Sequence, residues 1–75
     1  MAINEQNLPE LVKEVRKQLA LSQEDLAREL GVSFATVNRW ENGKSLPSKL
    51  AKAQFDSFCV KMVRQGKLIL SGGDR

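Results

Sequence analysis

The chain has 75 residues, a formal net charge of +3 and an ordinary globular composition, with 41% hydrophobic and 28% charged residues. This length allows one small domain with one modest core, and leaves no room for a catalytic domain beside a second module. One cysteine and no histidine exclude a disulfide framework, a zinc site and a Cys/His or Ser/His nucleophile pair, so we predict neither an enzyme nor a bound metal or cofactor.

The N-terminal stretch is polar, and we expect residues 1–7 to form a flexible N-terminus. The opening letters MAINEQNLPELV lack the basic-then-apolar layout of a signal peptide. The apolar runs of the chain are only a few residues long, which is too short to cross a membrane. These features favour a cytoplasmic protein that does not bind a membrane.

The first helix is predicted from apolar residues spaced i, i+3, i+4, i+7 and i+11, namely Leu8, Leu11, Val12, Val15 and Leu19. Pro9 fits the first turn of this helix, where a missing N–H group costs nothing. The spacing indicates an amphipathic helix with one buried face.

A second helix is predicted to begin after Ser22, a residue type that caps helix N-termini, with Asp25 three positions later. Its buried face consists of Leu26, Ala27 and Leu30. Gly31 follows that face, where the chain needs a residue that tolerates a left-handed conformation.

The third helix is predicted over residues 33–42, with Ser33 as its cap and Gly43 after its end. Val37 and Trp40 lie three residues apart and face the core. The opposite face holds an aromatic ring, a methyl group, an amide and a guanidinium, from Phe34, Ala35, Asn38 and Arg39. A solvated helix face normally carries Glu and Lys, so this composition indicates a contact surface.

The C-terminal part is predicted as a loop, KSLPS, followed by a long helix from Ser48 to about Gln65. We expect Leu46 to plug the core from the loop. The helix has an apolar stripe formed by Ala51, Phe55, Phe58 and Met62, with Cys59 as a small buried side chain on its flank. The stripe from Phe55 to Met62, together with the KLIL segment after the helix, is either core or a dimer interface. The domain is expected to span residues 8–66, followed by a flexible tail over residues 67–75.

The short connection between the second and third helices predicts a helix-turn-helix at residues 23–42 within an all-α domain of about four helices. The small side chain of Ala27 allows the helices to approach closely, and Gly31 suits the turn. Before Arg39 the chain has four basic and six acidic residues, a net charge of −2; from Arg39 onward it has eight basic and three acidic, a net charge of +5. This distribution suggests an anionic partner near the second half, although a solvated basic face would give the same counts.

The stretch VRKQLALSQEDLARELGVSFATVNRWENGKSLP, within residues 12–47, resembles the Cro/phage-repressor class of DNA-binding domains, the XRE family. The matching features are an Arg in the first helix, Ser-Gln opening the second, Leu-Gly-Val at the turn and Trp-Glu-Asn-Gly-Lys closing the third. The resemblance implies a lambda-repressor-like fold whose third helix enters the major groove of double-stranded DNA. The long fourth helix departs from the usual family pattern.

The resemblance also assigns roles to individual residues. The side chains expected to contact base edges are Ser33, Phe34, Ala35, Asn38 and Arg39. Those expected to contact phosphates are Ser22, Gln23, Thr36, Asn42, Lys44 and Lys49. Arg16 and Glu41 match an ion pair that joins the first helix to the third.

Side-chain chemistry supports the base contacts independently, because Arg suits guanine, Asn suits adenine, and Phe or Ala can meet a thymine methyl group. Two alternatives stay open at the sequence level. Phe34 could fold back onto the core, and Arg39 could pair with Glu29 or Glu41.

The sequence thus predicts a sequence-specific double-stranded DNA-binding transcriptional regulator, most simply a repressor. A homodimer through the C-terminal helix is one way to gain specificity from two half-sites. The alternatives are a protein-interaction module such as an antitoxin, with a protein partner on that helix, and the DNA-targeting domain of a larger protein.

Overall fold

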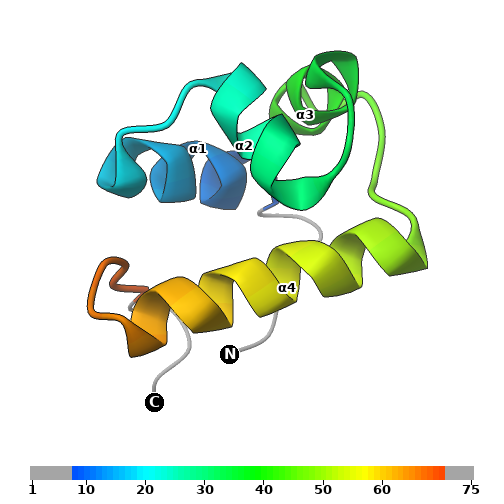
Figure 1. Cartoon of the computed structure of the whole chain (residues 1–75). Coiled ribbons are helices and arrows are strands. Elements are labelled where there is room, and N and C mark those ends of the chain that lie inside the picture. The colour runs from blue at the N-terminus through cyan, green and yellow to red at the C-terminus, as the bar shows by residue number, and fades with distance from the viewer. Residues whose placement is uncertain (1–7, 71–75) are drawn as a thin grey trace.

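The computed structural model describes residues 8–70, which form four helices and no strand. The helices are α1 (Leu8–Leu19), α2 (Gln23–Leu30), α3 (Phe34–Glu41) and α4 (Lys49–Arg64). In Figure 1, α1, α2 and α3 pack together on one side, and α4 runs across beneath them. The predicted all-α fold with an extended C-terminal helix is confirmed.

Three helices are preceded by a serine that caps their N-terminus. Ser22, Ser33 and Ser48 have extended backbones, and each hydroxyl accepts a hydrogen bond from the backbone N–H three residues later, at 2.9, 3.1 and 3.2 Å. Each cap satisfies one of the N–H groups that the first helical turn leaves without an intrahelical partner. The starts of α2, α3 and α4 are therefore encoded locally.

The turn between α2 and α3 depends on Gly31, which has φ +74°. Its N–H group donates to the carbonyl oxygens of Ala27 and Arg28, which closes the last turn of α2. This left-handed conformation is costly for residues that carry a Cβ atom. Ala27 is only 3% exposed, as expected for the small residue at the contact between the two helices.

The core draws side chains from every helix and from the chain that follows α4. Its fully or nearly buried members are Leu8, Val12, Val15, Leu26, Ala27, Leu30, Val37, Trp40, Ala51, Phe55, Phe58, Cys59, Met62 and Leu68. The predicted stripe on α4 is thus core rather than a free dimer interface. Burial, together with the negative charge of Asp56, raises the pKa of Cys59 to about 12, so this thiol is not a reactive group at neutral pH.

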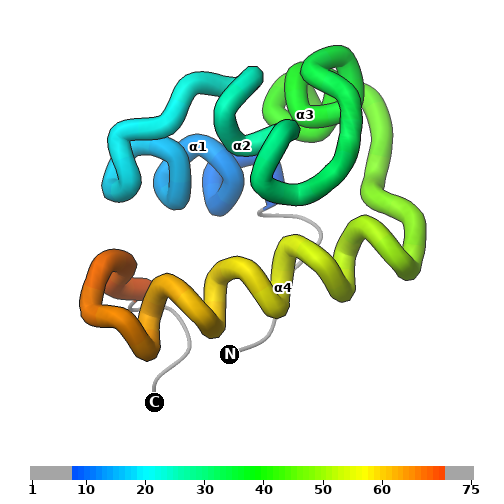
Figure 2. Tube along the Cα trace, viewed as in Figure 1, coloured from blue at the N-terminus to red at the C-terminus, as the bar shows by residue number. Residues whose placement is uncertain are grey.

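Two predictions about loops and ends are wrong. Leu46 is 58% exposed and does not plug the core. Leu68 is 1% exposed, so residues 67–70 belong to the packed domain and not to a flexible tail. Figure 2 shows this segment turning back from the end of α4 toward α1. The predictions for residues 1–7 and 71–75 lie outside the described residues.

Candidate DNA interface

The outer face of α3 carries the side chains predicted to contact bases. Ser33, Phe34, Ala35 and Arg39 are exposed, and Asn38 is partly buried. They share this face because the other side of the helix supplies Val37, Trp40 and Glu41 to the interior. The structure therefore brings all five predicted base-contact residues onto one surface.

The exposure of Phe34 answers a question that the sequence left open. Its side chain is 52% exposed, whereas a residue that had folded onto the core would resemble Trp40 at 2%. A half-exposed aromatic ring at the start of α3 is available for an apolar contact with a ligand.

Arg39 is also exposed, and within residues 8–70 it takes part in no ion pair. Of its two expected acidic partners, Glu41 is instead bound to Arg16. The guanidinium of Arg39 also makes no side-chain hydrogen bond with the described residues.

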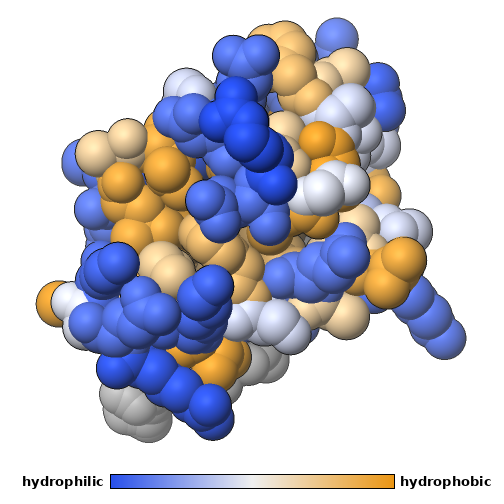
Figure 3. Space-filling view, in the orientation of Figure 1, coloured by the Kyte–Doolittle hydropathy of each residue, from blue (hydrophilic) through white to orange (hydrophobic). Residues whose placement is uncertain are grey.

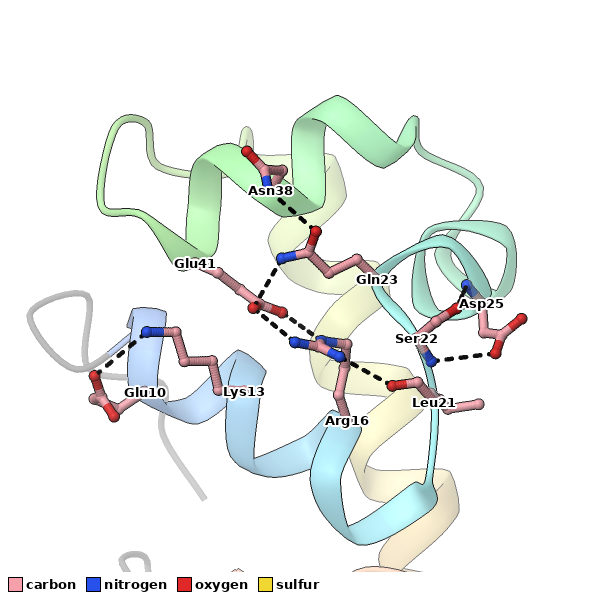
Figure 4. A network of polar contacts seen from close by, with 9 residues as sticks. All are labelled: Glu10, Lys13, Arg16, Leu21, Ser22, Gln23, Asp25, Asn38 and Glu41. Atoms are coloured by element: carbon pink, nitrogen blue, oxygen red, sulfur yellow. Dashed lines mark hydrogen bonds and ion pairs between the residues drawn. The ribbon is translucent and has the colours of Figure 1, made fainter.

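The Arg16–Glu41 pair joins α1 to α3, as Figure 4 shows. Nε and Nη2 of Arg16 donate to the two carboxylate oxygens of Glu41 at 2.6 and 2.9 Å, and Nη1 donates to the carbonyl of Leu21 at 3.1 Å. Burial by itself would raise the pKa of Glu41, but hydrogen bonds from Arg16 and Gln23 and the charges of Arg16 and Lys13 lower it overall. The same pairing raises the pKa of Arg16.

Gln23 is a predicted phosphate contact whose side chain makes two hydrogen bonds to α3. Its Nε2 donates to Glu41 at 3.0 Å, and its Oε1 accepts from Nδ2 of Asn38 at 3.1 Å. Asn42 extends this network, since its Nδ2 donates to Oδ1 of Asn38 at 3.1 Å. Sequence reasoning missed the network, because residues 15 or 18 positions apart on different helices leave no local pattern.

The remaining predicted phosphate contacts lie at the ends of α2, α3 and α4. The Ser22 hydroxyl caps α2, and the hydroxyls of Ser33 and Thr36 lie 2.8 Å apart at the start of α3. Lys44, in the loop after α3, and Lys49, at the start of α4, are both exposed.

Comparison with known families finds that a helix-turn-helix family model matches residues 12–51, more than half of the chain. The match covers most of α1, all of α2 and α3, and the start of α4. The chain belongs to this XRE-type helix-turn-helix family. No curated protein and no solved structure matches the sequence.

As an XRE-type domain, the chain is a DNA-binding regulatory domain. The matched residues include both members of the ion pair and the whole outer face of α3. Most of α4 and the segment after it lie beyond the match. The family match therefore does not extend to these parts of the domain.

Among residues 8–70, no three His, Cys, Asp or Glu side chains are grouped so that they could hold a metal ion. In the same residues, no helix has both the length and the apolar character needed to cross a membrane. The space-filling view in Figure 3 shows hydrophilic side chains over much of one face, with smaller hydrophobic areas between them.

Proposed function

We propose that this XRE-type domain binds double-stranded DNA sequence-specifically and regulates transcription as a repressor, with α3 in the major groove. The observation that carries the proposal is the outer face of α3, where an exposed arginine with no ion-pair partner among residues 8–70 shares the surface with an exposed aromatic ring and a methyl group. A major groove is wide enough to admit such a helix.

The chemistry of this face favours a mixed base sequence. The guanidinium of Arg39 can donate two hydrogen bonds to O6 and N7 of guanine, and Asn38 can bind N6 and N7 of adenine. Phe34 and Ala35 present apolar surface that suits the methyl group of thymine. Ser33 is a smaller polar contact at the N-terminal end of the helix.

Phosphate contacts would position the helix on the duplex. Ser22 and Gln23 lie at the N-terminus of α2, where the helix dipole favours an anion, and Thr36 and Asn42 lie on α3 and at its end. Lys44 and Lys49 add positive charge beyond the end of α3. Contacts of this kind carry affinity and salt dependence but little sequence information.

Useful specificity requires more base contacts than one short helix provides, so we infer that two copies bind two half-sites. We further propose that the protein acts in the cytoplasm. The buried stripe of α4 is unavailable for such a homodimer. The large exposed aliphatic residues of α4 are Leu50, Val60 and Val63, at 70%, 41% and 44% exposure, and they are the surface that a second copy would use.

The same exposed residues of α4 support a second candidate function. A regulator that also binds a protein, such as an antitoxin, or a DNA-targeting domain within a larger protein would use an apolar helix face for that contact. In either case α3 would keep its role on DNA.

The test is selection from a randomised double-stranded DNA pool with wild type, Arg39→Ala and the control Arg64→Ala. Arg64 is an exposed cation at the far end of α4, so its substitution removes the same charge away from α3. We expect an enriched motif whose binding weakens by about 1–3 kcal/mol in Arg39→Ala, with scrambled DNA little affected. Arg64→Ala should retain the motif.

Weak and steeply salt-dependent binding by wild type, without an enriched motif, would contradict the proposal. The basic half of the chain would then act only electrostatically. The protein-interaction function would become the leading candidate, with α4 as its surface.

A further inference from the structure

A continuous series of side-chain hydrogen bonds leads from the buried ion pair to the outer face of α3. Glu41 accepts from Gln23 at 3.0 Å, Gln23 accepts from Asn38 at 3.1 Å, and Asn38 accepts from Asn42 at 3.1 Å. Figure 4 shows Gln23 reaching from the start of α2 between Glu41 and Asn38. We call these three amides, Gln23, Asn38 and Asn42, the amide relay.

The direction of the relay is set at its buried end. An ionised carboxylate can only accept hydrogen bonds, so Gln23 must turn its NH₂ group toward Glu41. The carbonyl oxygen of Gln23 then faces Asn38, which must present its own NH₂ group in turn. Glu41 is 4% exposed and is held by two hydrogen bonds from Arg16, so this end of the relay is rigid.

The relay leaves Asn38 with a definite pattern of free groups. An asparagine amide has two N–H donors and an oxygen with two lone pairs. Gln23 takes one donor and Asn42 occupies one lone pair, so one donor and one acceptor site remain. The major-groove edge of adenine presents N7 as an acceptor and the N6 amino group as a donor, which complements this pair.

We propose that Gln23 is a positioning residue that holds the Asn38 amide in one orientation, so that Asn38 selects adenine at one position of the DNA site. This inference rests on the proposed function and deepens it, because it gives Gln23 a role in specificity beyond a phosphate contact. An Asn38 amide without this support could rotate by 180° and exchange its donor and acceptor. It would then distinguish adenine less well from other bases.

The experiment compares base preferences selected from random duplex DNA by wild type, Gln23→Met and Asn38→Ala. Methionine has a similar length to glutamine but cannot form either hydrogen bond. Asn38→Ala identifies the position that Asn38 contacts, as the position at which the preference is lost. Arg39→Ala identifies a second position, which serves as the internal control.

In Gln23→Met we expect the preference for adenine at the Asn38 position to fall by about tenfold. The preference at the Arg39 position should change by less than about twofold, because that side chain has no part in the relay. The double variant Gln23→Met/Asn38→Ala should lose no more preference at that position than Asn38→Ala alone.

Two results would overturn the inference while leaving the proposed function intact. One is a uniform loss of affinity in Gln23→Met with every base preference unchanged, which would make Gln23 a phosphate contact only. The other is that Asn38→Ala leaves all preferences as they are. Absence of any motif for wild type would instead overturn the proposed function itself.

A measurement on the wild-type protein keeps the inference testable if Gln23→Met does not fold. The Asn38 side-chain amide proton that is donated to Gln23 should exchange with water at least about tenfold more slowly than the side-chain amide protons of the exposed Gln54, because it is held in a hydrogen bond. If this proton exchanges as fast as those of Gln54, the Asn38 amide is not held and the inference fails.

Discussion

Glu41 shows how one buried carboxylate is kept charged between two helices. Its side chain is 3% exposed, a position that disfavours a negative charge. Arg16 contributes two hydrogen bonds to the carboxylate and Gln23 a third, and these outweigh burial and lower the pKa of Glu41. Glu41, which the resemblance assigned to a structural ion pair, thus also holds the buried end of the amide relay.

The substitution Arg16→Met should lower the free energy of unfolding by about 3 kcal/mol at pH 7, because it leaves Glu41 buried and unpaired. Since the pKa of Glu41 in the folded wild-type protein lies below its ordinary value of 4.5, the pair stabilises the fold above that pH. The stabilisation is lost as the pH falls through the lowered pKa. Urea unfolding at pH 7 and pH 3 should therefore show a smaller cost of Arg16→Met at pH 3.

Arg28→Met is the matched control. Arg28 pairs with Asp25 at 3.2 Å, but its side chain is 71% exposed and solvent screens the pair. Its substitution should change stability little at either pH. An equal cost for the two variants, or a cost of Arg16→Met that does not depend on pH, would show that the ion pair is not what holds α1 to α3.

At the scale of the elements, α1 is terminated by an alanine in a left-handed conformation, which the sequence did not predict. Ala20 follows the helix with φ +57°, and within residues 8–70 it is the one residue other than glycine with a positive φ. The N–H groups of Ala20 and Leu21 donate back to the carbonyls of Lys17 and Arg16 at 3.3 and 2.9 Å. This is the hydrogen-bonding position that glycine usually occupies after a helix.

Ala20→Gly should raise the free energy of unfolding by about 0.5–1 kcal/mol. Glycine removes the steric strain of the left-handed conformation, and this gain exceeds the extra conformational entropy that glycine gives to the unfolded chain. Thermal unfolding measures the change directly. Ala53→Gly provides the control at an exposed position inside α4, where the same substitution should destabilise by about 1 kcal/mol. Destabilisation by both substitutions would contradict the assignment of strain to Ala20.

At the scale of the whole molecule, the segment after α4 closes the domain. The side-chain amide of Gln18 donates to the backbone oxygen of Ile69 and accepts from its N–H group, both at 2.8 Å. Leu68 enters the core beside these bonds, and Leu70 packs against it. The end of the described chain is thereby attached to α1, 51 residues earlier.

Leu68→Ala should lower the free energy of unfolding by about 2–4 kcal/mol, because it removes a buried side chain and leaves a cavity. Ile69→Ala is the neighbouring control, since Ile69 is 76% exposed and bonds only through its backbone. Chemical denaturation of both variants should separate them clearly. Similar small losses would mean that residues 67–70 do not contribute to the core.

Much of the fold was predictable because its signals are local. Apolar spacing indicated all four helices, the three serine caps marked the starts of α2, α3 and α4, and Gly31 marked the turn. The exposed face of α3 followed from the inward positions of Val37 and Trp40. Leu46 and Leu68 were predicted wrongly because an isolated leucine in a loop has no periodicity to show which side it faces.

The sequence by itself determined that this protein is a small helical domain with a helix-turn-helix and an unusual outer face on α3, because periodicity and capping act within a few residues. Only the tertiary structure decided which polar groups meet. It left Arg39 without an ion-pair partner among the described residues, exposed Phe34, joined Gln23 to Asn38 and placed Leu68 in the core. These outcomes depend on the angles between helices, and those angles result from packing the whole core at once.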